Sequence, residues 1–474
     1  MSTTDNTEET PLLPASRPAK RISKRTPLPK LQLSVIMLIQ ICEPLASQSI
    51  YPYINQLISE LDITGGDEKK VGYYAYVESL FFLGEFTTVL QWSRASDRIG
   101  RKPILLIGLF GTGTATLCFG LSRTFITLAI SRCVCGLLNG NMGVMKAAMT
   151  DLTDSSNRAE AFAFLPIIWA IGASLGPLIG GSLARPHDRF PEIFSGKFWE
   201  LFPYFLPCLV TGSCVYLSCV FVLAFFKESI PRKKARREDV VATSHDNVAP
   251  APVIRPRPLR ELMIFPVLIS VSNYIALWFL NMSLGALLPL FLAMPIEIGG
   301  LGLPPPKIGV ILSAYGIFTA IFQIIFFARM VRRFGEKRVF RNAMITCLPA
   351  FALFPIISAV ARQSGRTTIV YCLVGLILAL GALMDTGFGA IFLFVTASAP
   401  KSSRGSVNGI AQSAIALARA IAPSLSTSLF SLSVQHNLLG GNLVYAFFLI
   451  LSCGALVLAR GLPAEVWPEE DDEI

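Results

Sequence analysis

Residues 92–103 read WSRASDRIGRKP, and this stretch decides the fold of the 474-residue chain. It is short and rich in cations, and it separates two long apolar segments, residues 71–91 and 103–122. Two membrane spans joined by so short a loop form a hairpin, and an excess of Arg and Lys marks a loop as cytosolic. The stretch therefore predicts a membrane protein and fixes the orientation of its second and third spans.

The composition supports a chain that lies in lipid, since 53% of its residues are hydrophobic and only 15% are charged. In lipid the backbone polar groups must be satisfied within the chain, so the spans are predicted to be helices. The formal net charge of +10 alone would suit a nucleic-acid partner. The cations, however, lie in loops between the spans, so topology explains them and we expect no nucleic-acid partner.

Apolar windows that can cross about 30 Å of hydrocarbon fall into two groups of six. They lie near residues 31–54, 71–91, 103–122, 124–149, 160–184 and 203–226, and near 263–292, 308–328, 340–360, 368–395, 408–432 and 441–460. We predict an all-α membrane protein with about twelve transmembrane helices in two pseudo-symmetric six-helix bundles, residues 31–226 and 263–460. Residues 1–30, 227–262 and 461–474 are predicted to be a disordered cytosolic tail, a cytosolic linker and an acidic cytosolic tail.

Clusters of cations alternate along the chain with loops that are poor in cations or balanced in charge, which predicts that both termini are cytosolic. In the linker, the basic residues 232–237 serve as a topology signal or, alternatively, bind anionic lipid head groups. The tail residues 8–13, EETPLL, resemble a sorting signal toward the vacuole or lysosome. We therefore expect a vacuolar or lysosomal membrane, with the plasma membrane as the alternative.

An internal repeat supports two related halves. Residues 329–337, RMVRRFGEK, lie between the second and third spans of the second half, as residues 94–102 do in the first. Aligned, the two stretches match Arg98, Gly100 and Lys102 with Arg333, Gly335 and Lys337. The position of Asp97 is taken by Arg332, so the first half alone keeps the carboxylate. This pattern predicts parallel repeats with an asymmetric charge arrangement.

The ten cysteines all lie in predicted spans, which argues against a disulfide framework and favours buried free thiols. With three His in the whole chain, we expect no protein metal site and no cofactor.

The order Asp-Arg-x-Gly-Arg-Lys, at this place between the second and third spans, resembles the loop signature of the major facilitator superfamily. The resemblance implies a gate in which Asp97 holds the cytosolic ends of the bundles together, with Arg98, Gly100, Arg101 and Lys102 around it. An anion near a helix N-terminus gains about 0.3–1 kcal/mol, which suits a contact that opens in each cycle. The alternative is an ordinary basic loop with a glycine turn.

The fifth span contains GASLGPLIGG, residues 172–181. Its small residues permit close helix approach, and its proline bends the span. The segment resembles the motif of the drug:proton antiporters of that family, which implies hinge and interface roles for Gly172, Gly176, Pro177, Gly180 and Gly181. Residues 42–44, 150–159 and 299–303 resemble the fungal and plant zinc-induced-facilitator-like branch.

Arg132 lies inside the fourth span, where a cation is costly and needs a partner or water. It resembles the family's fourth-helix arginine, which is linked to proton coupling. At about 1.5 Å per residue, Glu43 and Arg132 both lie about 18 Å from the cytosolic face. We therefore predict that the two act together in proton coupling; the alternative is that backbone or water satisfies each separately.

Four further polar residues in spans are candidates for a substrate cavity: Glu78, Asn139, Gln323 and Asp385. Glu78 and Asp385 would bind protons or a cation, and Asn139 and Gln323 would form hydrogen bonds. Helix–helix hydrogen bonding is the alternative role for each of them.

Together these features predict a secondary active transporter, not an enzyme, that works by alternating access. No phosphate-binding loop of the Gly-x-x-x-x-Gly-Lys-Ser/Thr type occurs, which disfavours ATP-driven transport. We expect a monomer in membrane lipid that exchanges protons for a small organic compound, drug or metal chelate, by export or sequestration. A proton symporter for uptake and a non-transporting receptor or scaffold with this fold are the alternatives.

Overall fold

The computed structural model describes residues 27–61, 66–74, 76–153, 157–228, 263–398, 404–465 and 467. Within these ranges all regular structure is helical. Ten helical segments there are long and apolar enough to cross a membrane. Two further long helices, of 23 and 26 residues, complete twelve spans. The predicted all-α architecture is therefore confirmed.

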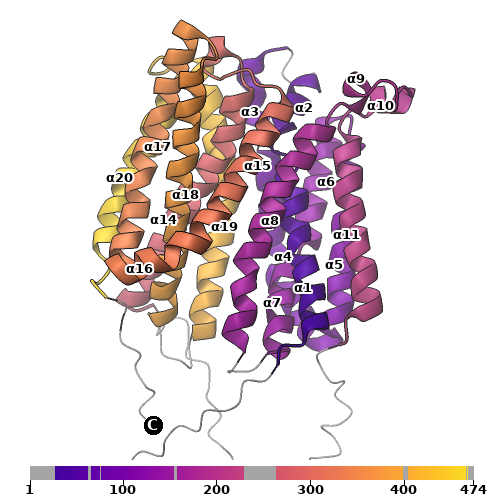
Figure 1. The fold of residues 1–474 in the computed structure, drawn as a ribbon, viewed down its shortest axis with the longest axis vertical. Helices are drawn as coiled ribbons and strands as arrows, with labels where there is room; N and C mark the ends of the chain where they lie inside the picture. The colour runs from indigo at the N-terminus through magenta and orange to yellow at the C-terminus, as the bar shows by residue number, and fades with distance from the viewer. Residues whose placement is uncertain are drawn as a thin grey trace, which may run out of the picture.

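The spans of the first half lie on one side of the molecule (Figure 1). They are α1 (Lys30–Gln48), α4 (Val77–Ile99), α5 (Arg101–Gly120), α6 (Phe125–Leu138) with α7 (Asn141–Asp151), α8 (Arg158–Leu183) and α11 (Phe205–Phe225). The short helices α2 (Ile54–Glu60), α3 (Val71–Tyr74), α9 (Pro186–Arg189) and α10 (Lys197–Leu201) lie at one end, called here the upper end. Helix α1 begins at the opposite, lower end, where α20 also ends.

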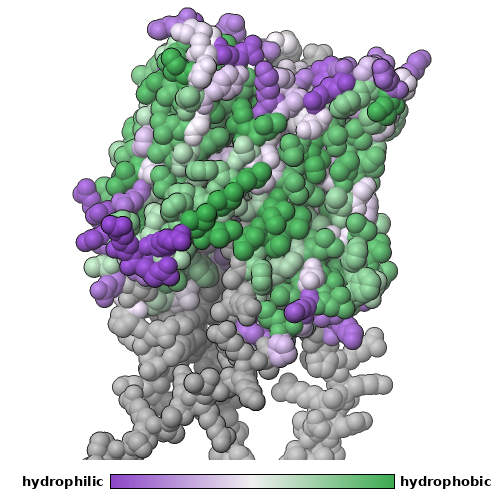
Figure 2. Space-filling view, in the orientation of Figure 1, coloured by the Kyte–Doolittle hydropathy of each residue, from purple (hydrophilic) through white to green (hydrophobic). Residues whose placement is uncertain are grey.

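The spans of the second half lie beside them. They are α14 (Phe265–Ala293), α15 (Pro305–Phe322) continued by α16 (Ala328–Phe334), α17 (Glu336–Ser364), α18 (Thr368–Ala397), α19 (Arg404–Gln435) and α20 (Leu443–Arg460). An apolar band covers the middle of the visible face and polar residues gather at both ends (Figure 2). This distribution suits a protein whose middle faces lipid tails.

The fourth span, predicted as one segment near 124–149, is broken in the structure between α6 and α7. A side chain at Gly140 would collide with Trp92 of α4, so glycine permits the close approach of the two helices. The carbonyl oxygen of Leu137 accepts hydrogen bonds from Thr88 Oγ1 at 2.9 Å and from Trp92 Nε1 at 2.8 Å. Side chains of α4 thus satisfy a backbone group that the break leaves free, as the membrane interior requires.

Two other spans also differ from their predicted form. The first span, expected over 31–54, ends at Gln48, and α2 follows after a turn. The eighth span contains a π-helical segment, Gln323–Phe327, between α15 and α16. Such segments often mark functional positions in helices.

The two halves are packed together at the upper end. The backbones of α8 and α15 approach so closely that a Cβ at Gly181 would lie 2.5 Å from the Pro305 oxygen. The backbone N–H of Ser424 in α19 donates to Ser79 Oγ of α4 at 3.0 Å. Helices α8 and α15 lie side by side there and diverge toward the lower end (Figure 1). In this conformation the halves are therefore joined at the upper end.

Candidate functional site

A cluster of charges joins the two halves inside the membrane-spanning region. Arg419 of α19 lies between Glu43 of α1, with Nη2 3.8 Å from Oε1, and Glu85 of α4, with Nη1 3.9 Å from Oε2. The three side chains are 17%, 10% and 9% exposed, in that order. At these separations the groups attract through their charges without close hydrogen bonds, and burial strengthens that attraction.

Aromatic rings surround the guanidinium of Arg419. Its Cζ lies 4.4 Å from the centre of the Phe82 ring and 5.5 Å from that of Trp278. The Trp278 ring lies 4.6 Å from that of Phe388, and among the described residues its buried Nε1 has no hydrogen-bond partner. Cations bind favourably over aromatic faces, most of all over Trp. The cluster therefore combines two acids and Arg419 with an aromatic wall contributed by both halves, and Lys146 of α7 is close enough to attract both acids.

Sequence reasoning missed Arg419, although the signal was present. The residue falls in the predicted span 408–432, and the rule that singled out Arg132 applies to it equally. Glu85 likewise lies in a predicted span.

The predicted partnership of Glu43 with Arg132 is not the contact that the structure contains. Arg132 Nη2 donates instead to Glu78 Oε2 at 2.5 Å, and both side chains are buried. Helix α6 lies so close to α4 that a Cβ at Gly136 would collide with the backbone oxygen of Phe81. Depth along the membrane normal placed Glu43 and Arg132 at one level, but the rotation of each helix decides which side chains meet.

The remaining cavity candidates lie apart from one another. Asp385 of α18 accepts hydrogen bonds from Asn281 Nδ2 at 2.8 Å and from Tyr315 OH at 3.1 Å. Gln323 is partly exposed at the start of the π-helical segment. Asn139 lies at the break of the fourth span and lines a small cavity with Glu43. The four candidates therefore do not line one common cavity in this structure. The fourth of them, Glu78, pairs with Arg132.

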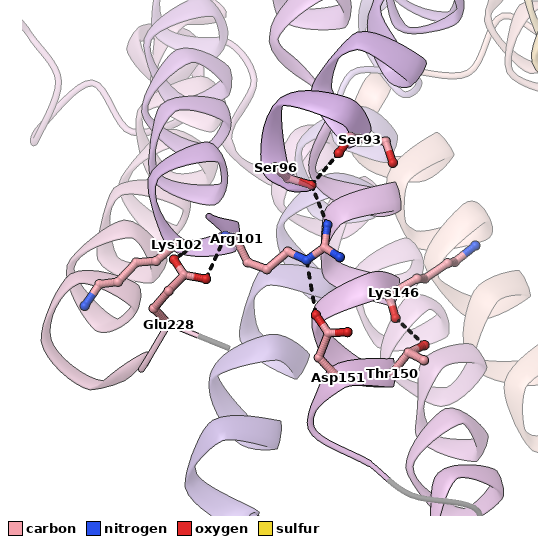
Figure 3. A network of polar contacts seen from close by, with 8 residues as sticks. All are labelled: Ser93, Ser96, Arg101, Lys102, Lys146, Thr150, Asp151 and Glu228. Carbon is pink, nitrogen blue, oxygen red and sulfur yellow. Dashed lines mark hydrogen bonds and ion pairs between the residues drawn. The ribbon is translucent and has the colours of Figure 1, made fainter. Parts of the chain in front are cut away.

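Residues 92–103, predicted as a loop, are the last turns of α4, Gly100 and the first residues of α5, and they take part in a compact polar network (Figure 3). Arg101 donates from Nε to Asp151 Oδ2 at 3.2 Å and from Nη1 to Ser96 Oγ at 2.6 Å. The carboxylate of Glu228 accepts from the backbone N–H groups of Arg101 at 2.8 Å and Lys102 at 3.0 Å. Glu228 therefore caps the N-terminus of α5, which no pattern in the sequence predicted.

Gly100 is required by this cap. Its φ is +119°, and a Cβ there would lie 2.5 Å from Glu228 Oε2. Asp97 belongs to the last turn of α4, and its side chain lies outside the described residues; Arg98 is exposed. The gate contact predicted for Asp97 thus stays a prediction.

A lysine makes an equivalent contact in each half. Lys102 Nζ donates to the Leu223 oxygen at 2.8 Å, near the end of α11. Lys337 Nζ donates to the Arg460 oxygen at 3.3 Å, at the end of α20. Each lysine thus ties the third span of its half to the sixth. These contacts agree with the internal repeat found in the sequence.

Replacing Asp97 by Asn is expected to leave folding and membrane delivery nearly intact but to reduce turnover strongly. The reason is that Asp97 is the one carboxylate in an otherwise basic loop, and the second-half copy lacks it. Transport rates in reconstituted vesicles at matched protein levels measure the effect. Normal rates for this variant would show that the loop does not act as a gate.

The glycines of the fifth-span motif lie at two helix interfaces. A Cβ at Gly172 would lie 2.9 Å from the Ile41 oxygen of α1, and a Cβ at Gly176 would lie 3.0 Å from the Leu45 oxygen. A side chain at Gly180 would collide with the Ser49 oxygen, just after α1. Gly181 faces Gly309 of α15, and Pro177 is buried beside them. The motif therefore packs α8 against α1 within the first half and against α15 of the second half.

Comparison with known proteins identifies the family. The family model of the Major Facilitator Superfamily matches residues 36–423 and, in a second match, 279–470. The Major facilitator-type transporter psiT2 of Psilocybe cyanescens is 30% identical, over 88% of this chain and 87% of that protein. The Major facilitator superfamily multidrug transporter mfsB of Aspergillus fumigatus is 27% identical, over 94% and 84%. Protein ZINC INDUCED FACILITATOR-LIKE 1 of Arabidopsis thaliana is 27% identical, over 93% of each chain.

The chain belongs to the Major Facilitator Superfamily. It is therefore an integral, multi-pass membrane transporter of small molecules and not an enzyme. The relatives include a multidrug transporter and a zinc-induced-facilitator-like protein, which confirms the branch that the motifs resemble.

Proposed function

We propose that this protein exchanges protons for a small organic compound, drug or metal chelate, which it exports or sequesters by alternating access. The observation that carries the proposal is the charge cluster in which Arg419 of one half lies between Glu43 and Glu85 of the other. At an effective dielectric constant of 20, an ion pair at this separation is worth about 4 kcal/mol before desolvation. A proton on Glu43 removes one of these attractions and so changes the free energy of the joined conformation.

This arrangement provides the coupling that antiport requires. A ligand shifts a conformational equilibrium only through a difference in its interaction with the two states. Glu43 meets Arg419 only when the halves are joined at this level, so its protonation state differs in free energy between the conformations. The motif of the fifth span and the multidrug relative support export. In this proposal Arg132 holds α6 to α4 through Glu78, and the role predicted for Arg132 in proton coupling stays a prediction.

The proposal also covers placement in the cell. The distribution of cations supports cytosolic termini, and residues 8–13 support a vacuolar or lysosomal membrane, with the plasma membrane as the alternative. The transporter is proposed to act as a monomer.

Replacing Glu43 by Gln tests the proton site. A comparison of metabolites and metals in vesicles with and without the protein first selects a transported compound. An acidic vesicle lumen should then drive uptake of that compound through the wild type, because protons leave as the compound enters. In the Glu43→Gln variant the pH-driven flux should vanish while exchange of labelled for unlabelled compound persists. The exposed residue Glu297 provides a matched control variant, Glu297→Gln.

Three other results would change the interpretation. If an imposed pH gradient drives no flux through the wild type, antiport is wrong and a uniporter or receptor is favoured. If an acidic lumen drives loss of the compound instead, the protein is a symporter. If Glu43→Gln responds as the wild type does, the proton site is elsewhere, with Asp385 and Glu78 as the next candidates.

A further inference from the structure

A small cavity lies beside Glu43, among the helices of the first half. Its volume is about 20 Å³. The lining comes from α1, α5 and the two ends of the broken fourth span: Ile39, Cys42, Glu43, Leu109, Thr112, Asn139, Asn141 and Met145. A cavity needs about 10–15 Å³ of such volume to hold one water molecule. The space is therefore of the right size for a single small polar guest.

Four buried polar atoms at this cavity make no hydrogen bond of ordinary geometry within the described part of the chain, although the side chains of Asn139 and Glu43 lie close enough to attract each other. They are Glu43 Oε2, Thr112 Oγ1, Asn139 Nδ2 and Asn141 Oδ1, and all are buried. Thr112, Asn139 and Asn141 are 7%, 3% and 7% exposed as residues. A buried polar atom without a hydrogen bond destabilises the folded protein. Four such atoms at one cavity indicate a guest that satisfies them together.

We propose that this cavity is a binding site for one water molecule, which links Glu43 to the break in the fourth span. The donors and acceptors match a water molecule. Its oxygen accepts from Asn139 Nδ2 and the Thr112 hydroxyl, and its two hydrogens are donated to Glu43 Oε2 and Asn141 Oδ1. A buried water typically makes two to four hydrogen bonds of this kind. A metal cation fits less well, because Asn139 presents an N–H donor to the cavity.

The site connects the carboxyl group of Glu43 to the helix break. Asn139 and Asn141 flank Gly140, where α6 ends and α7 begins. Protonated Glu43 becomes a donor to the water, so the water oxygen gives up one of the two hydrogen bonds that it accepts, from Asn139 or from Thr112. This consequence rests on the proposed function of Glu43 in proton coupling. The charged groups that face Glu43 from the packed helices are Arg419, Glu85 and Lys146.

X-ray hydroxyl-radical footprinting of the full-length protein in detergent tests the site. Radiolysis of a bound water creates a radical at the cavity, where Met145 is only 1% exposed to bulk solvent. Oxidation of this methionine to the sulfoxide is then read by mass spectrometry. Met149, one turn further along α7 and 0% exposed, is the matched internal control. We expect Met145 to be oxidised several-fold faster than Met149; equal rates would overturn the proposal.

Variants of Thr112 test whether the polar groups that line the cavity hold the water. Thr112→Ile removes the hydroxyl, adds a methylene to the small space and should bring the Met145 rate down to that of Met149. Thr112→Ser keeps the hydroxyl and should keep fast oxidation. Thr116→Val, one turn along α5 in a buried position away from the cavity, should also leave it fast. Fast oxidation that persists in Thr112→Ile would overturn the assignment.

The footprint does not depend on transport. A wild type that shows no pH-driven flux but a fast Met145 reaction would end the antiport proposal and leave the water site standing. A slow Met145 reaction with intact pH-driven flux would do the reverse.

Discussion

Replacing Arg419 by Gln is expected to abolish pH-driven transport and to weaken the contact between the halves at the upper end. The substitution leaves Glu43 and Glu85 buried and facing the space of a lost cation. Breaking a buried ion pair from one side costs about 3–5 kcal/mol. Because the N–O separations are 3.8 and 3.9 Å, we expect the lower end of that range, about 3 kcal/mol. That cost shifts the conformational equilibrium by about 100-fold.

The joined conformation can be measured by a disulfide at the upper end. The backbone N–H of Ser424 donates to the Ser79 hydroxyl across the halves, and we expect cysteines at these two neighbouring positions to cross-link in the wild-type background. The cross-linked peptide is identified by mass spectrometry, which separates it from the native thiols. In the Arg419→Gln background its yield should fall sharply. An unchanged yield together with normal pH-driven flux would show that the cluster does not couple protons to conformation.

A lysine at position 419 separates charge from shape. Lys keeps the positive charge, but it lacks the planar guanidinium that lies over Phe82 and Trp278. We expect Arg419→Lys to restore the cross-link partly and transport weakly. Equal behaviour of the Lys and Gln variants would mean that the aromatic contacts, not the charge, join the halves.

The fold was predictable because each span appears in the sequence as a long run of apolar residues. Apolar windows and basic loops follow from the cost of polar groups in lipid, and they identified the twelve spans and the repeat. The break in the fourth span could not be predicted in this way, because a glycine such as Gly140 is equally typical of an unbroken helix at a packed interface. At the break, the ring of Trp92 from another helix fills the space that a side chain at position 140 would need.

The candidate site was predictable only in part, because a sequence gives the depth of a residue but not the face of the helix on which it lies. Depth placed Glu43 and Arg132 together, whereas helix rotation pairs Arg132 with Glu78 and turns Glu43 toward Arg419. The cap on α5 is harder still to foresee. Glu228 lies more than a hundred residues from Gly100, in a polar stretch without periodicity.

Arg419 and Arg132 therefore have different roles. Arg419 joins the halves through contacts near 4 Å, which suits an attraction that must be broken and remade. Arg132 makes a closer contact with Glu78, within one half and between neighbouring helices. A short, fully buried pair between elements that stay together is a structural contact, so loss of Arg132 should impair folding before it impairs coupling.

Replacing Arg132 by Met is therefore expected to destabilise the folded protein severely. The change leaves the Glu78 carboxylate buried without its cation, at a cost of about 3–5 kcal/mol. It also removes the guanidinium from the faces of Phe81 and Phe119, 5.2 and 5.5 Å away. The fraction that remains monodisperse after heating in detergent measures this loss. Arg123→Met, which removes an exposed arginine, is the control and should have little effect.

The double variant Glu78→Met/Arg132→Met shows whether the unpaired Glu78 carboxylate causes the loss of stability in Arg132→Met. With both charges gone, no unpaired ion remains in the membrane interior, and apolar side chains of similar length fill the space. Buried ion pairs replaced in this way often lose little stability. We expect the double variant to recover most of the heat resistance that Arg132→Met loses, and to fall short by the lost cation–π contacts, each worth about 1–2 kcal/mol. If the double variant is as unstable as the single one, packing against Phe81 and Phe119 is what Arg132 contributes, and the ion pair with Glu78 is secondary.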